Sequence, residues 1–164
     1  MDEALSLATV VVLEWFRALQ LPEQLHRVSS ERFEDLPPAS RVWGLKMGSA
    51  RVFILLTPAD AGARLKVLSP ILRLPADTQR PAFFEELLRL NATAVSACAF
   101  GINDDDEVIV TTDRSTLDLN VDELNELIIS VSENADLYDN LLSDQFGAEM
   151  LGEDPAPDSP RMSW

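Results

Sequence analysis

The chain has 164 residues, of which 46% are hydrophobic and 25% charged, a composition typical of one folded domain rather than a disordered chain. Its formal net charge is −15, and residues 104–164 carry the whole excess, because acidic and basic residues balance within 1–103. Such a surface repels phosphates, so we expect no direct binding of nucleic acid and no binding to membranes.

Residues 2–20 predict a helix that is apolar nearly all round, because Val10 and Leu13 lie off its main stripe. The run follows two acidic residues, and Glu14 and Arg17 interrupt it, so it lacks the pattern of a signal peptide. It is also too short to span a bilayer. Two interpretations stay open: a core helix of a monomer, or a helix that also packs against a partner chain.

Two residues bear on compartment and chemistry. Cys98 is the single cysteine, which excludes an internal disulfide. With no export signal, this predicts a cytoplasmic protein. Cys98 lies among small apolar residues and is interpreted as a buried thiol rather than a nucleophile, since His26 is the single histidine and so the only histidine base. We interpret His26 itself as a solvated loop residue rather than a ligand.

After a loop at residues 21–40, which has room for a short helical turn or extended segment, the sequence predicts three strands. They cover residues 41–49, 50–58 and 63–75, separated by turn residues. The run "VFILL" in the second is apolar on both faces and predicts a central strand. Pro70 predicts an edge or a bend in the third strand, because proline cannot donate to a ladder.

Residues 77–92 predict a second helix, capped by Asp77 or Thr78 and with Pro81 in its first turn. Two strands follow at residues 94–102 and 107–113.

A long amphipathic helix at residues 120–147 completes the pattern. Asn120 and Glu123 resemble a capping box, and Gly147 is a natural stop. Residues 148–164 are rich in Pro, Asp and Ser, which predicts a disordered tail.

Three aspartates in a row follow Asn103 between the last two strands. A calcium loop counted from Asn103 needs glycine at its sixth position and glutamate at its twelfth, but Val108 and Arg114 stand there. Asn and Asp also tolerate the backbone of tight turns. We therefore interpret residues 103–106 as the tip of a hairpin and predict no metal and no cofactor.

These elements predict an α+β fold in the order α-β-β-β-α-β-β-α, with helices packed on a twisted antiparallel sheet of about five strands. Residues 1–147 are predicted to form a single domain, followed by the tail at 148–164.

The stretch from residue 83 to residue 147 resembles the YbjN family of bacterial proteins. The shared pattern is a helix ending in "LLRLNA", a small-residue strand ending in "FGI", an acidic turn, an apolar strand and a helix with a Tyr-Asp pair. The resemblance implies the fold of type III secretion chaperones, often a homodimer that binds an extended client segment, and it carries over no catalytic residues. The residues that fit are Leu87, Leu88, Asn91, Phe100, Gly101, Val108, Leu124 and Tyr138.

The preferred hypothesis is a non-enzymatic, homodimeric protein-binding module of chaperone-like or regulatory character. Trp43, Met47 and Phe53 are the candidate partner contacts, with ordinary core positions as the alternative, and Trp164 is a candidate docking anchor at the end of the chain. The competing hypothesis is an acidic adaptor or decoy whose C-terminal third binds a basic partner protein, such as one that itself binds nucleic acid. The alternative interpretation is that this negative charge only keeps the protein soluble.

Overall fold

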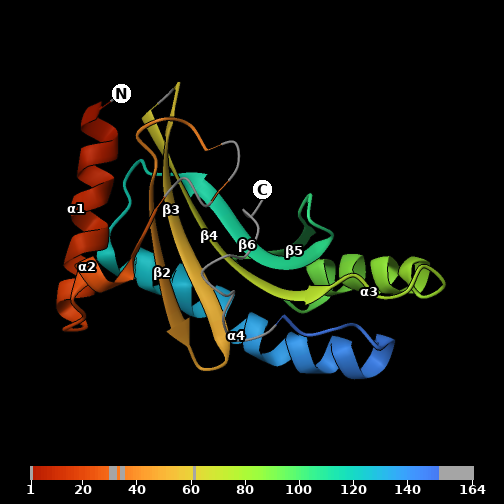
Figure 1. Ribbon diagram of the computed structural model, residues 1–164. Helices are drawn as coiled ribbons and strands as arrows, with labels where there is room; N and C mark the ends of the chain where they lie inside the picture. The colour runs from red at the N-terminus through yellow and green to blue at the C-terminus, as the bar shows by residue number, and fades with distance from the viewer. Residues whose placement is uncertain (1, 30–32, 34–35, 61, 152–164) are drawn as a thin grey trace.

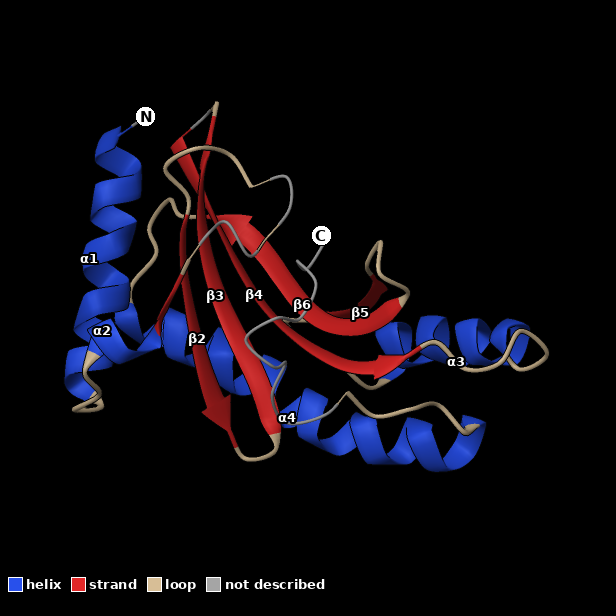
Figure 2. Ribbon diagram, viewed as in Figure 1, coloured by secondary structure: helices blue, strands red, loops and turns tan. Residues whose placement is uncertain are grey.

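A twisted antiparallel sheet of six strands, in the order β1-β2-β3-β4-β6-β5, forms the centre of the computed structural model (Figures 1 and 2). The structure describes residues 2–29, 33, 36–60 and 62–151. The strands are β1 (Arg27–Val28), β2 (Arg41–Met47), β3 (Ala50–Ala59), β4 (Gly62–Arg73), β5 (Ala99–Ile102) and β6 (Glu107–Ser115). The helices are α1 (Asp2–Ala18), α2 (Glu23–His26), α3 (Arg80–Thr93) and α4 (Val121–Phe146).

Helices α1 and α4 cover one face of this sheet. Figure 1 shows α1 along one side and α4 crossing the sheet, and α4 contacts β3, β4 and β6. The two helices also touch each other, and the Trp15 indole N–H donates to Asn125 Oδ1 at 3.0 Å. The main core lies between the sheet and these helices, where side chains spaced three or four apart on each helix are buried.

Helix α4 begins and ends as its sequence predicts. The Asn120 side chain accepts a hydrogen bond from the backbone N–H of Glu123 at 3.0 Å, and Gly147 ends the helix with φ +65°. Its 26 residues span about 39 Å. Its C-terminal half therefore continues past β2 and β3 and lies on the same side of the molecule as α3 (Figure 1).

The opposite face of the sheet carries a second, smaller core. Phe53, Leu55 and Leu68 point away from α4, and Phe33 from the β1–β2 connection packs on them, with its ring 5.6 Å from that of Phe53. Val42 completes the buried set. Strands β3 and β4 are therefore buried on both faces, as "VFILL" predicts for β3.

The predicted order of the main elements is confirmed, with two differences in the strands. The loop at residues 21–40 contains α2 and β1, so the sheet gains a sixth, two-residue strand. The strand predicted at 94–102 begins only at Ala99, because α3 continues to Thr93 and Ala97 adopts φ +58°. The bend that Pro70 predicts in the latter half of β4 is confirmed by a register shift between Pro70 and Leu72, and the pairing of β4 with β3 ends at Leu68.

The start of α3 also differs from the prediction. Its N-cap is Gln79, and no side chain caps the first turn. Asp77 instead pairs with Arg80 at 3.2 Å.

Residues 103–106 form the turn of the β5–β6 hairpin, as predicted. Asn103 is buried, and its side-chain oxygen accepts the backbone N–H groups of Asp105 at 3.1 Å and Glu107 at 2.9 Å. Asp106 adopts φ +58°, a conformation that aspartate tolerates. The run of aspartates is therefore explained by backbone geometry.

The first part of the predicted tail packs on the domain, which corrects the predicted boundary at residue 148. Ala148 is buried, and the Glu149 carbonyl accepts the Arg73 N–H at 2.9 Å. The Leu151 N–H donates to the Ile71 carbonyl at 3.1 Å. This short pairing lies beside the bulge in β4. Residues 152–164, the rest of the predicted tail, lie outside the described residues. Within the described part of the chain, no helix has the length and hydropathy needed to cross a membrane.

We predict that a chain ending at Gly147 is less stable than one ending at Leu151. The longer chain keeps the two backbone hydrogen bonds to β4 and the burial of Ala148, together worth about 2 kcal/mol of unfolding free energy. Urea denaturation of both truncated chains measures the difference. Equal midpoints would show that residues 148–151 contribute nothing to the stability of the domain.

Candidate functional site

Strand β1 forms one edge of the sheet, but it is so short that most residues of β2 have no strand beside them on that side. Strand β1 pairs with two residues of β2, Val42 and Trp43, although β2 has seven. His26, just before β1, follows along the same edge and places its Nδ1 3.2 Å from the carbonyl oxygen of Gly44. His26 is half-buried and stacks on Phe16 at 5.3 Å, so it is not the solvated loop residue that the sequence predicts.

Trp43 of β2 stabilises this edge from the side of the main core. Its indole is fully buried in the main core, and its N–H donates to Glu23 Oε1 at 2.6 Å. The Arg27 guanidinium lies over the indole ring, 5.8 Å from the centroid, and 3.7 Å from the same Glu23 oxygen. Strand β1 is thus held by side chains as well as by its two-residue ladder.

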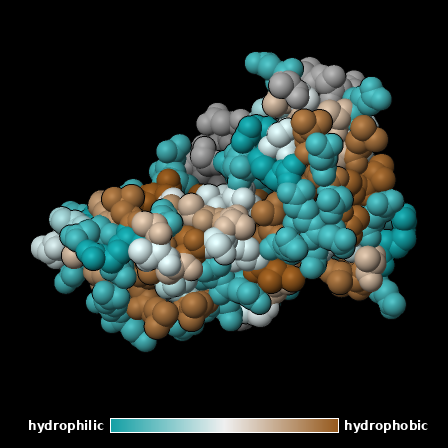
Figure 3. All heavy atoms as spheres, turned by 180° about the vertical axis from the view of Figure 1, so that it is seen from behind, coloured by the Kyte–Doolittle hydropathy of each residue, from teal (hydrophilic) through white to brown (hydrophobic). Residues whose placement is uncertain are grey.

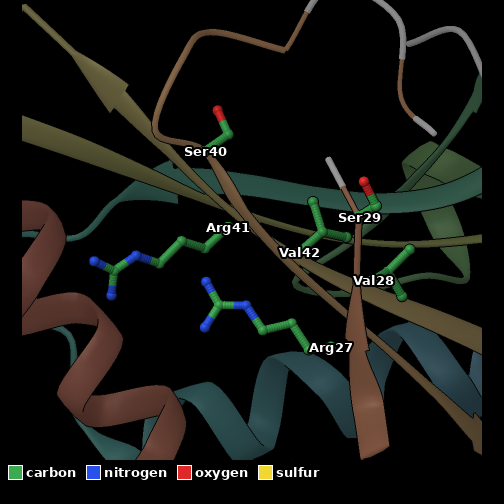
Figure 4. Close-up of a pocket in the computed structure, with 6 residues that line it drawn as sticks. All are labelled: Arg27, Val28, Ser29, Ser40, Arg41 and Val42. Carbon is green, nitrogen blue, oxygen red and sulfur yellow. The ribbon is translucent and has the colours of Figure 1, made fainter. Parts of the chain in front are cut away.

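A polar hollow of about 250 Å³ opens where β1 stops pairing with β2. Figure 4 shows the guanidinium groups of Arg27 and Arg41 extending to the same side of the strands, toward a helix, and the two serine side chains lying elsewhere around the hollow. The lining residues are Arg27, Val28, Ser29, Ser40, Arg41 and Val42.

The other edge of the sheet, β5, is closed by a side chain of α3. Asn91 Oδ1 accepts the N–H of Phe100 at 2.7 Å, and Asn91 Nδ2 donates to the carbonyl of Phe100 at 3.1 Å. The amide therefore makes the pair of hydrogen bonds that a neighbouring strand would make. The Phe100 ring packs edge-on against Tyr138 of α4 at 5.3 Å. The hollow lies at the edge formed by β1 and β2, and not at the β5 edge.

The four residues singled out from the sequence do not form one site. Trp43 lies in the main core and Phe53 in the second core on the other face of the sheet. Met47 is half-buried at the end of β2. Trp164 lies outside the described residues. A partner-binding role stays a prediction for all four. Trp43 is fully buried, so in this structure a partner could not contact its side chain.

Exposed apolar side chains gather on the helices instead. Leu7 is 63% exposed and Val10 50% on α1, while Leu137 and Leu141 are 53% and 50% exposed on α4. Figure 3 shows apolar patches on the side where α1 lies and over the end where α3 and α4 lie, separated by polar surface. The first helix is therefore not fully enclosed by its own chain.

Cys98 and His26, the nucleophile and the base considered from the sequence, have different neighbours in the described structure. Burial raises the pKa of the Cys98 thiol, which keeps it protonated, and its neighbour is Ser130 rather than His26. Within the described ranges, no group of three or more His, Cys, Asp or Glu side chains has a geometry that could hold a metal ion.

Comparison with known proteins decides the family. Residues 21–154 match the family described as type III secretion system (YopN, CesT) and YbjN peptide-binding chaperone 1. The chain belongs to this family. No curated protein matches it.

Solved structures show that this chaperone family member has the fold of type III secretion chaperones. The HopA1–SchA chaperone–effector complex aligns with a TM-score of 0.57 at 13% identity, over 85% of this chain and 98% of that chain. The ExsC–ExsE complex gives 0.54 at 15% identity, over 87% and 97% of the two chains. The ExoU–SpcU heterodimer of the Pseudomonas aeruginosa type III secretion system gives 0.51 at 17% identity, over 80% and 97%.

Three of the family-pattern residues that the sequence identified make contacts between elements of the fold. Asn91, Phe100 and Tyr138 fix α3, β5 and α4 to one another through the contacts above. The arginines of the hollow escaped the sequence analysis. Their separation along the chain gave no local motif, and the short strand β1 that pairs the two segments lies in the stretch predicted as loop.

A clamp between the β2–β3 turn and α4 also escaped the sequence analysis. The hydroxyl and the backbone N–H of Ser49 both donate to Asp136 Oδ1, and these hydrogen bonds lower the pKa of Asp136. Burial raises the pKa of the neighbouring Asp139 carboxyl, helped by the nearby Asp136 charge. The pKa values of these two neighbouring carboxyl groups are therefore shifted in opposite directions.

We predict that Asp136→Asn lowers the unfolding free energy near neutral pH and that the difference from the wild type disappears on acidification. A carboxyl whose pKa is lowered on folding adds stability above its unfolded-state pKa, about 3.9, and loses that contribution as the pH falls through its folded pKa. The difference should be constant at neutral pH and shrink below about pH 4. Denaturant unfolding across this range measures it.

The matched control is Asp144→Asn, which removes the same charge from an exposed position of the same helix. The control should not reproduce this pH profile. Identical profiles for the two variants would mean that the loss reflects net charge rather than the clamp.

Proposed function

We propose that this protein is a non-enzymatic chaperone that binds an extended segment of a client protein and works as a homodimer. The observation that carries the proposal is the match of residues 21–154 to a family of peptide-binding chaperones. That match covers the whole sheet, α3 and α4, so it includes the surfaces on which a segment would lie.

The geometry supports binding of an extended segment at the β1–β2 edge. A segment that adds to a sheet edge gains main-chain hydrogen bonds, and its alternate side chains enter neighbouring pockets. Strand β1 covers only part of β2, and the polar hollow lies beside it. The β5 edge is less suited, because Asn91 already bonds both backbone groups of Phe100.

A homodimer is supported by the exposed apolar side of α1. Leu7 and Val10 are too exposed to contribute fully to the core of their own chain, and they lie on the same side of the helix. Burial of such side chains against a second copy would remove apolar area from water, which favours association.

An acidic adaptor remains the second candidate function, and the charge of α4 is the observation that favours it. This helix carries no basic residue, so it presents one sign of charge to a basic partner. Its acidic residues are Asp122, Glu123, Glu126, Glu133, Asp136, Asp139 and Asp144.

Partner capture at two ionic strengths separates these functions. The full chain is used to capture partners from its native host at low and at high salt, and each retained partner is then tested as overlapping short peptides. A peptide-binding chaperone should retain a client in high salt and bind one contiguous stretch of it. An acidic adaptor should lose its partner in high salt and bind only the folded protein, because exposed charges are screened. The second result would contradict the chaperone proposal.

The homodimer has its own test. Light scattering at micromolar concentration should give twice the chain mass of 18.2 kDa. Leu7→Glu should give the monomer, because it places a charge in the apolar contact, whereas the control Ser6→Glu, at the neighbouring exposed position, should stay dimeric. A monomeric wild type would contradict the homodimer, and a dimeric Leu7→Glu would exclude α1 as the contact.

A further inference from the structure

Arg41 is a half-buried cation that lines the hollow at the β1–β2 edge. Among the described residues, none forms a hydrogen bond or an ion pair with the Arg41 guanidinium, although Arg41 is half-buried. A guanidinium carries five N–H donors in a planar fork that fits two oxygens of a carboxylate or phosphate. Arg41 is therefore placed to receive an oxyanion from outside the chain.

Arg27 supplies a second, pre-positioned cation beside it. Its guanidinium is held over the Trp43 ring, and its nearest carboxylate oxygen, Glu23 Oε1, is 3.7 Å away. That oxygen already accepts the Trp43 indole N–H at 2.6 Å, so Glu23 compensates the charge of Arg27 only in part. The Arg27 side chain remains 53% exposed. Figure 4 shows that both guanidinium groups extend to the same side of the strands.

The strands around the hollow are basic even though the whole chain is strongly acidic. Strands β1 to β4 contain no acidic residue, so no carboxylate within them competes for the two arginines. Arg64 and Lys66 pair with Asp113 of β6, so the basic side chains that line the hollow itself are those of Arg27 and Arg41. The basic residues of β1 to β4 are Arg27, Arg41, Lys46, Arg51, Arg64, Lys66 and Arg73.

We propose that Arg27 and Arg41 form a specificity pocket for an acidic side chain of the client segment, an Asp or Glu whose carboxylate sits between the two guanidinium groups. This inference rests on the proposed peptide-binding function and adds the chemistry that the client must carry. The apolar side chains of Val28 and Val42 point to the other face of the sheet, into the second core, so they take no part in holding the carboxylate. A phosphorylated side chain offers the same oxyanion, and the test below distinguishes it from a carboxylate.

The first part of the test identifies peptides. Random peptides are selected on the full chain, and the selected pool should be enriched in Asp or Glu at one fixed position. One selected peptide is then made in three versions, with Glu, Gln or phosphoserine at that position, and its affinity is measured for each variant of the protein.

The variants are Arg41→Gln and Arg27→Gln, with Arg89→Gln as the matched control. Arg89 is an exposed arginine of α3, at the other end of the molecule, where it pairs with Glu85 at 2.7 Å. On the wild type and on Arg89→Gln, changing Glu to Gln in the peptide should weaken binding about tenfold. On Arg41→Gln, the Glu and Gln peptides should bind alike, because the partner of the carboxylate is gone.

Equal binding of the Glu and Gln peptides to the wild type would overturn the specificity pocket. So would an unchanged preference for Glu in both arginine variants. Tighter binding of the phosphoserine version, lost in Arg41→Gln, would support the pocket and identify phosphate as its natural oxyanion.

A second measurement separates failure of this inference from failure of the chaperone function. Inorganic phosphate is titrated into the full chain while the Nε–Hε signals of Arg27 and Arg41 are followed by NMR. Saturable shifts that disappear in Arg41→Gln support the oxyanion site even where no peptide is selected, and that case would contradict only the peptide function. Absent or non-saturating shifts overturn the site itself.

Discussion

Burial of both faces of β3 and β4 is the constraint on which the rest of the architecture depends. Ile54 and Leu65 point into the main core beneath α1 and α4, while Phe53 and Leu68 point the opposite way. Two helices cover one face, and the other face is closed by Phe33 from the connection between β1 and β2. Strand β1 pairs with β2 at the edge of this sheet, and the hollow lies beside that pairing.

The second organising feature is the separation of charge between the strands and the last helix. Acidic residues fall on α4, where no basic residue balances them, and basic residues fall on β1 to β4, where no acidic residue does. Like charges on one helix repel, so α4 depends mainly on burial of side chains such as Leu124 and Ile128, and its Glu123 pairs with Arg114 of β6.

Sequence periodicity predicted the elements whose packing is local and missed those that depend on distant contacts. The caps of α4, the apolar β3 and the hairpin at Asn103 follow from neighbours in the chain. Strand β1 has two residues, and it is a strand because it pairs with β2, which lies more than ten residues later in the chain. Pro70 predicted an edge or a bend because a proline lacks one donor, and the register shift beside it is that bend. The order of elements was thus predictable, whereas the hollow was not.

The burial of Trp43 shows why a large apolar residue alone does not predict a partner-binding position. Sequence cannot tell whether an aromatic residue on a half-buried strand faces the core or a partner, because both environments select the same side chain. An arginine differs, because a half-buried cation needs compensation. Arg27 finds part of it in Glu23 and Trp43, and Arg41 finds none within the described chain. The proposal of a pocket at this edge therefore rests on an arginine that lacks a polar partner among the described residues, and not on exposed apolar surface.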